Sequence, residues 1–320
     1  MARQSSATKV VYAALLGNVL IAATKAAAAA YTGSSAMLSE AVHSLVDTGN
    51  ELLLLYGMRQ ARRPPDTAHP FGHGRELYFW SFIVALMVFA LGAGISLYEG
   101  INHIAHPVPI EYPLVNYVVL GVSFIFEGSS WWIALRAFRA AKGRLGYLEA
   151  VSLSKDPTTF TVLFEDSAAL VGLIIAFAGI ACASAFDVPE LDGVASLGIA
   201  LVLGTTAVVL ARRTKELLIG ESAYPAVQSS ILKIANAQRG IVHANGVLTM
   251  QLSPHQVVAA LSAEFDDKLT TTEIEACVNS LEAQIREAQP EISILFVKPQ
   301  TAAVWQARRK VIEAGDDGSD

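Results

Sequence analysis

Long apolar segments occupy the first two thirds of the chain. A helix needs about 20 consecutive apolar residues to cross the hydrocarbon core of a bilayer, and six segments reach that length. They are residues 10–31, 36–58, 78–103, 113–138, 159–185 and 191–212. The pattern therefore predicts an α-helical membrane protein with six transmembrane helices.

The last third of the chain has frequent charges, and its apolar runs are no longer than a strand. It predicts helix, strand, strand, helix and strand at residues 225–236, 244–252, 256–265, 270–288 and 292–297. The threonines at Thr270–Thr272 offer an N-cap to the second helix, with Glu273 as an early acidic residue. This αββαβ order is typical of a small α+β domain of the ferredoxin-like type. The predicted domains are a transmembrane domain at 1–212, the ferredoxin-like domain at 213–300 and a polar, disordered tail at 301–320.

Composition agrees with a membrane location. The chain is 53% hydrophobic and 16% charged, with a mean hydropathy of +0.43, whereas soluble domains carry about 25% charged residues. The net charge is −6, and no basic patch with interleaved aromatics suggests a nucleic-acid partner. Two cysteines give no disulfide framework and no paired metal motif.

The loops between the apolar segments differ in charge. The links at 59–77 and 139–158 contain several arginines and lysines, whereas those at 32–35, 104–112 and 186–190 contain none. Because basic loops stay on the cytoplasmic side, we expect both termini and the C-terminal domain to face the cytoplasm. The first apolar run is longer than the core of a cleaved signal, so we expect a retained helix in a multi-pass protein of a bacterial inner membrane.

Acidic groups and a histidine lie within two of these apolar segments. His43 and Asp47 are in the second, and Asp166 with its neighbour Glu165 is in the fifth. A charge at bilayer depth costs about 2.5 kcal/mol or more, so it is usually retained for an ion or proton pathway. Residues four apart share one helix face, and imidazole with carboxylates suits Zn²⁺. The alternative is a buried hydrogen-bonded set that only stabilises helix packing.

A second candidate metal site lies in the basic loop after the second segment. Asp66, His69 and His73 provide a His-x₃-His pair with a nearby carboxylate, which is a plausible ligand set. The alternative is a solvated polar loop.

Three stretches resemble the cation diffusion facilitator family, and most closely its zinc transporter 9-like branch. They are YTGSSAMLSEAVHSLVDTGNELLLL (residues 31–55), HPFGHGRE (69–76) and FEDSAALVG (164–172). The resemblance implies six spans, a cytoplasmic domain that mediates homodimerisation, and exchange of a divalent metal for protons.

The resemblance also implies a transport site with two ligands on the second span and two on the fifth. His43, Asp47 and Asp166 match this pattern, but the remaining position is Val162, which cannot bind a metal. Glu165 is the candidate replacement for the fourth ligand.

Further roles follow from the same resemblance. Glu51 and Asn18 are candidate accessory residues, while Asp66, His69 and His73 match the family's loop metal site. Arg75 and Glu221 match a charge pair that acts as a hinge between the membrane domain and the tail.

These observations predict a secondary transporter that exports Zn²⁺, with Mn²⁺ or Fe²⁺ as alternatives, in exchange for protons. The metal is substrate, and no prosthetic group is expected. Two other classes stay open: a membrane metal sensor or adaptor that binds without transport, and an intramembrane metalloenzyme. The enzyme would need a water-activating base beside an open zinc position, commonly as HExxH, and the chain has no HExxH.

Overall fold

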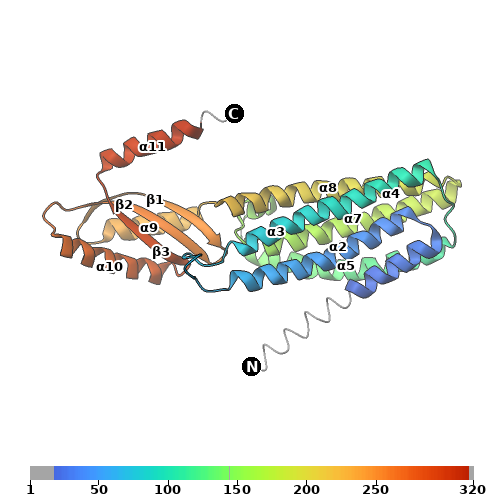
Figure 1. Ribbon diagram of the computed structural model, residues 1–320, viewed down its shortest axis with the longest axis horizontal. Coiled ribbons are helices and arrows are strands. Elements are labelled where there is room, and N and C mark those ends of the chain that lie inside the picture. Colours follow the sequence, from blue (N-terminus) through green and yellow to red (C-terminus); the bar gives the residue numbers. More distant parts are fainter. Residues whose placement is uncertain (1–17, 144, 317–320) are drawn as a thin grey trace, which may run out of the picture. The chain divides into compact units, whose positions relative to one another are not determined.

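The computed structural model describes residues 18–143 and 145–316 (Figure 1). The chain divides into two compact units between Lys215 and Glu216. The first unit is helical and the second combines helices with a three-stranded sheet.

The helices of the first unit follow the predicted apolar segments closely. They are residues 18–32, α2 (Ser35–Ala61), α3 (Glu76–Met87), the π-helical turn η1 (Val88–Ala93), α4 (Gly94–Ala105), α5 (Pro113–Lys142), α6 (Tyr147–Leu153), α7 (Pro157–Phe186) and α8 (Glu190–Ile219). The elements α3, η1 and α4 form one continuous helix. Residues 10–17 of the first predicted span lie outside the described part. The short α6 is an addition, because seven residues without a long apolar run carry no span signal.

Four helices of the described part are long and apolar enough to cross a membrane: Glu76–Ala105, Pro113–Ala140, Phe160–Phe186 and Glu190–Ile219. Their outward-facing side chains include Ile125 and Leu201, both 72% exposed. A soluble bundle would bury such residues, and a lipid-facing one does not. The prediction of a helical membrane-type domain is therefore confirmed, while the number of spans stays a prediction.

The helix α2 packs against α3, α4 and α7 at the centre of this unit. A carboxylate from α8 caps its first turn: Asp192 accepts hydrogen bonds from the Ser35 backbone N–H (2.5 Å), the Ala36 backbone N–H (3.2 Å) and the Ser34 hydroxyl (2.9 Å). The first N–H groups of a helix have no partner within it, and an anion there is favoured by the helix dipole. Asp192 therefore ties the start of α2 to α8.

The second unit contains α9 (Pro225–Ala237), β1 (Ile241–Ser253), β2 (Gln256–Phe265), α10 (Thr271–Ala288), β3 (Ile292–Pro299) and α11 (Ala302–Asp316). The strand β2 is central, antiparallel to β1 and parallel to β3. Alternate residues of β2, such as Leu261, are buried with Ile231 of α9 and Leu281 of α10. The predicted αββαβ order is confirmed, and the ferredoxin-like class itself stays a prediction.

The predicted cap of α10 is present as a capping box. The Thr270 hydroxyl accepts from the Glu273 backbone N–H at 3.4 Å, and the Glu273 carboxylate accepts from the Thr270 backbone N–H at 2.8 Å. The hydrogen bond from the Thr270 backbone, with that from the Thr270 hydroxyl, lowers the pKa of Glu273.

The sequence predicts a disordered tail at residues 301–320, and the structure has the helix α11 at Ala302–Asp316 within this range. The indole of Trp305 lies against Gly246 of β1, where a Cβ would clash with the ring. The Ala302 backbone N–H donates to Glu264 of β2 at 3.2 Å. A single aromatic anchor in a polar sequence gave too weak a hydrophobic pattern to predict this helix.

Candidate metal site

A cavity of about 330 Å³ lies within the first unit, between four helices. Its walls come from residues 18–32, α2, α5 and α7, and its lining is rich in acidic and hydroxyl side chains. The lining residues are Asn18, Ile21, Ser44, Asp47, Glu51, Phe126, Glu127, Ser129, Ser130, Ile133, Val162, Glu165 and Asp166. The structure thus brings Asp47, Glu165, Asp166, Glu51 and Asn18, all predicted from the sequence, to one cavity.

His43 lies beside this cavity rather than on its wall. Its Nδ1 is 3.4 Å from Oδ1 of Asp47, one helical turn further along α2. The side chain is 1% exposed, and neither ring nitrogen has a hydrogen-bond partner among the described residues. A buried polar atom is normally satisfied, so an unpartnered imidazole next to a carboxylate is a fit for a metal ligand.

The neighbours Glu165 and Asp166 point to different helices. Glu165 is buried and accepts a hydrogen bond from Asn50 of α2 at 2.7 Å. Asp166 accepts from the Ser130 hydroxyl of α5 at 2.9 Å. This divergence agrees with the roughly 100° between successive residues of a helix. Sequence analysis missed Asn50 and Ser130, because neutral polar residues in a span carry no charge signal.

The remaining predicted side chains also line the cavity. Glu51 accepts a hydrogen bond from Asn18 at 2.8 Å. Val162 lines the cavity one turn before Asp166, so the position of the family's fourth ligand does face the site but offers no donor.

The ligand side chains do not converge to metal-binding distance in this conformation. Among the described residues, three or more ligand atoms of His, Cys, Asp or Glu lie within 4.8 Å of one another only at Asp66, His69 and His73. Asp47 and Asp166 therefore line two walls of the cavity without forming a closed ligand cluster.

Lys25, in the helix of residues 18–32, pairs with Glu40 of α2, which the sequence analysis did not identify as a site residue. The ammonium of Lys25 lies 3.2 Å from Glu40 and donates to the Ser44 hydroxyl at 2.7 Å. The partner is 15 residues away on the neighbouring helix, a relation that no spacing rule predicts.

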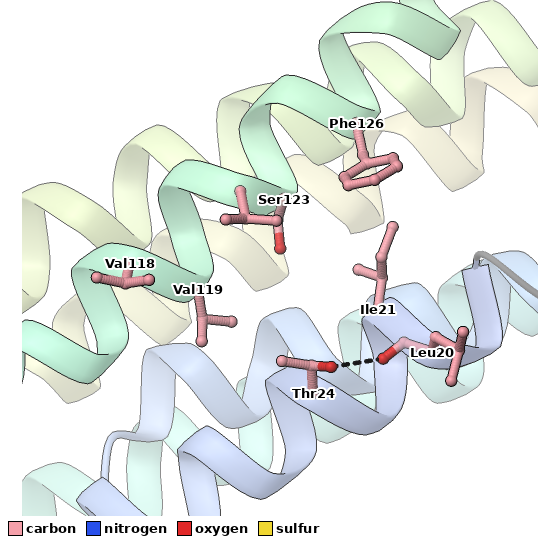
Figure 2. Close-up of a pocket in the computed structure, with 8 residues that line it drawn as sticks. Leu20, Ile21, Thr24, Val118, Val119, Ser123 and Phe126 are labelled. Atoms are coloured by element: carbon pink, nitrogen blue, oxygen red, sulfur yellow. Dashed lines mark hydrogen bonds between the residues drawn. The ribbon is translucent and has the colours of Figure 1, made fainter.

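A second hollow, also of about 330 Å³, lies between residues 18–32 and α5 (Figure 2). Its lining is almost entirely apolar and includes Leu20, Val118 and Val119. The Thr24 hydroxyl that reaches its edge donates to the Leu20 carbonyl at 2.7 Å. Because the described residues of its lining include no charged group, this hollow offers no site for a cation.

The predicted loop site has the closest ligand geometry of the described chain. Asp66 Oδ2 lies 3.1 Å from Nε2 of His73, and its Oδ1 lies 3.2 Å from Nδ1 of His69. The two imidazole rings are 4.3 Å apart. Gly72, between the histidines, has a φ of +81°, a conformation that glycine adopts without cost. His73 is buried, while Asp66 and His69 are exposed.

The loop also controls the charge of its carboxylate. The His69 backbone N–H donates to Asp66 Oδ1 at 2.6 Å, and this hydrogen bond, followed by that with the His73 side chain, lowers the pKa of Asp66 to about 2. Asp66 is therefore an anion at every physiological pH, ready to bind a cation.

Arg75 and Glu221, the predicted hinge pair, belong to different units of the structure. Arg75 directly precedes α3, and the Glu221 carbonyl accepts from the Gln251 backbone N–H at 2.8 Å within the second unit. Their pairing stays a prediction.

Residues 11–219 match the family model of the cation efflux transmembrane domain. This range covers more than half of the chain and contains the entire acidic cavity. The chain belongs to the cation diffusion facilitator family. Within this family it lies near the zinc transporter 9 branch.

Relatives within the cation diffusion facilitator family support that position. The chain is 35% identical over 266 residues to the proton-coupled zinc antiporter SLC30A9, mitochondrial, of Xenopus laevis, which covers 82% of this chain and 47% of the relative. It is 32% identical over 227 residues to metal tolerance protein C4 of Arabidopsis thaliana, covering 70% and 50%. It is 24% identical over 312 residues to the cation-efflux pump FieF of Klebsiella pneumoniae, covering 94% and 98%.

The chain thus spans about half the length of the first curated relatives that it matches. The relatives named here include an antiporter and a pump, and none is named as an enzyme. This agrees with the expectation of a transporter rather than a metalloenzyme.

Proposed function

We propose that this protein is a secondary active transporter that exports a divalent metal ion from the cytoplasm in exchange for protons. The observation that carries the proposal is the cavity inside a membrane-type helix bundle, where Asp47 of α2 faces the Asp166 wall of α7 with His43 adjacent. Zn²⁺ is the proposed substrate, because imidazole and carboxylate ligands suit it, and relatives are named as zinc antiporters. Mn²⁺ and Fe²⁺ are the alternatives for a site richer in oxygen ligands.

Exchange follows from the chemistry of the ligands. A metal binds only to deprotonated imidazole and carboxylate groups, so metal release and proton uptake are linked at one site. The imidazole of His43 and the carboxylates of Asp47 and Asp166 would all take part in this exchange, because each binds either a proton or the metal. A more acidic medium on the far side of the membrane would then drive export.

The proposed topology has six spans, with residues 18–32 and α2 added to the four strongly apolar helices. From the basic loops we propose that both termini and the second unit lie in the cytoplasm. We propose a bacterial inner membrane as its location, although the animal relatives are named as mitochondrial. We also propose that the second unit is a ferredoxin-like domain reduced to three strands.

We propose that the second unit mediates homodimerisation through its open sheet face. Leu248 pairs with Ala260, and Ala260 with Phe296, so the three form one apolar row across the sheet. All three are exposed, Leu248 and Phe296 by 54% each. They face away from α9 and α10, since buried residues of β2 alternate with exposed ones.

Replacing Phe296 by Glu should shift the purified protein towards the monomer, because a charge would be buried at the centre of the apolar row. Light scattering coupled to size exclusion in detergent measures the mass. Ala283→Glu, which places the same charge at an exposed position of α10, is the control and should leave the mass unchanged. An unchanged dimer in Phe296→Glu would place the interface elsewhere.

We propose that Asp66, His69 and His73 hold a second metal ion, as their spacing and geometry support. In a background with the transport site disabled by Asp47→Asn, adding Asp66→Asn should weaken the remaining zinc binding by about tenfold or more, because an anionic ligand is lost. Since the pKa of Asp66 is lowered to about 2, protonation of this carboxylate should not cause any loss of zinc binding in mild acid. Calorimetry with zinc measures both effects, and Glu111→Gln in another loop is the control. Unchanged zinc binding in the double variant would refute the loop site.

The transport proposal is tested with the full chain in proteoliposomes that contain a trapped pH dye. A gradient of Zn²⁺ should produce proton flux in the opposite direction, and parallel runs with Mn²⁺ and Fe²⁺ identify the preferred metal. Metal binding without flux, in protein shown to be folded and inserted, would favour the sensor or adaptor function.

A further inference from the structure

Lys25 is a completely buried cation in the helix formed by residues 18–32. Its ammonium lies 3.2 Å from Oε2 of Glu40, donates to the Ser44 hydroxyl at 2.7 Å, and lies 3.9 Å from Oε1 of Glu127. Both Lys25 and Glu40 are 0% exposed. Removing an ion from water is unfavourable, and pairing offsets this only when the geometry is excellent, so two well-packed apolar residues are often at least as stable. The pair therefore calls for a functional explanation.

The position of the pair relative to the cavity supplies one. Glu40, Ser44, Asp47 and Glu51 are spaced four, three and four residues apart, so they form one polar stripe along α2. The last three line the cavity, whereas Glu40, the next position of the stripe, is buried beyond it. Lys25 contacts Ser44 and Glu40 together, and so lies where the cavity ends.

The bundle is closed tightly around Glu40. Its Oε1 lies against Gly172 of α7, so closely that a Cβ at that position would clash with the carboxylate. The same oxygen has no hydrogen-bond partner among the described residues. The polar stripe therefore continues past the cavity to Glu40, whose Oε1 is an acceptor without a hydrogen bond among the described residues. At this point α2 and α7 are tightly packed.

Glu127 connects this pair to the metal site. It is 16% exposed and lines the cavity together with Asp47 and Asp166, yet it also lies 3.9 Å from Lys25. A metal cation bound among these carboxylates would repel the ammonium of Lys25. Both cations would also compete for the carboxylate of Glu127. Because the Coulomb interaction falls only with the first power of distance and is weakly screened in a protein interior, this repulsion persists beyond contact distance.

We propose that Lys25 is a tethered cation that competes with the transported metal for the acidic groups of the pathway. The inference rests on the proposed transport function and adds a mechanism for release of the metal ion from the site. In the metal-free carrier, Lys25 pairs with Glu40 and Glu127. It thereby occupies the polar stripe of α2 beyond Ser44. When a divalent ion occupies the cavity, repulsion weakens both sets of contacts. Because such coupling is reciprocal, the ammonium lowers metal affinity and favours release.

The test is the dissociation constant for Zn²⁺ of the full chain in nanodiscs at neutral pH, measured by calorimetry. Lys25→Met should bind zinc at least about tenfold more tightly, since a nearby positive charge is removed. Lys25→Arg, which keeps the charge, should stay within about threefold of the unmodified protein. A merely structural lysine predicts the opposite sign, because a damaged site binds more weakly.

A second variant covers the case that Lys25→Met leaves Glu40 unpaired and does not fold. Lys25→Met/Glu40→Gln removes both buried charges while retaining Glu127, and it should also bind zinc more tightly. Unchanged or weaker binding in the folded variants overturns the proposal. Zinc binding by the unmodified chain without any proton flux would instead refute the transport function, and the affinity comparison would still report on Lys25.

Discussion

Asp47→Asn should abolish metal-driven proton flux, with a loss of about 100-fold or more. The change preserves the shape of the side chain but removes the carboxylate next to His43, 3.4 Å from its Nδ1. A zinc site normally requires three or four ligands. The proposed set is His43, Asp47 and Asp166 with Glu165 as the candidate fourth ligand, while Glu51 and Glu127 line the same cavity. Removing the one ligand that contacts another leaves too few donors to hold the ion.

The measurement is zinc-driven quenching of a pH dye in proteoliposomes, with equal amounts of inserted protein. Glu99→Gln in α4 is the matched control, because it neutralises a carboxylate of the same unit that does not line the cavity. It should retain normal flux. If Asp47→Asn retained more than about a third of the flux, the acidic cavity could not be the transport site as assigned.

The helices of the membrane-type unit could be predicted from the sequence because their signal is local. The apolar run at 159–185, for example, corresponds to α7 at Pro157–Phe186. The helix begins at a proline in its first turn and is followed by a residue in the left-handed conformation. The capping box at Thr270 was predictable for the same reason, since both partners lie within one turn.

The contacts of the polar groups were not predictable to the same degree. The sequence places Glu165 and Asp166 next to each other, but their hydrogen bonds depend on which helix lies on each side of α7. Because α7 packs against α2, Glu165 accepts a hydrogen bond from Asn50. Because α7 also packs against α5, Asp166 accepts one from Ser130. Lys25 likewise has a partner that only helix packing determines. Helix α11 depends on the fit of Trp305 over Gly246, which a sequence pattern does not encode.

Val162→Asp should bind Zn²⁺ about tenfold more tightly and turn over more slowly. Val162 lines the cavity one helical turn before Asp166, so a carboxylate there would share a face with Asp166. The site would then have two ligands from α2 and two from α7, the four-coordinate set that zinc prefers. If zinc binds more tightly in every conformation of the transporter, a lower zinc concentration gives half-maximal flux. Release of the ion becomes slower, so the maximal flux should fall.

Val162→Asn is the matched control, since it has the shape of the aspartate without its charge. Glu165→Gln, made in the unmodified protein and in the Val162→Asp variant, then identifies the native fourth ligand. If Glu165 supplies it, the change should weaken zinc binding in the unmodified protein and have little effect in the Val162→Asp variant, because the new carboxylate would replace it. If Glu165→Gln weakens binding equally in both backgrounds, Glu165 acts on the site through Asn50 of α2. If Val162→Asp leaves the zinc affinity unchanged, the ion binds closer to α2. Val162 of α7 would then only line the pathway.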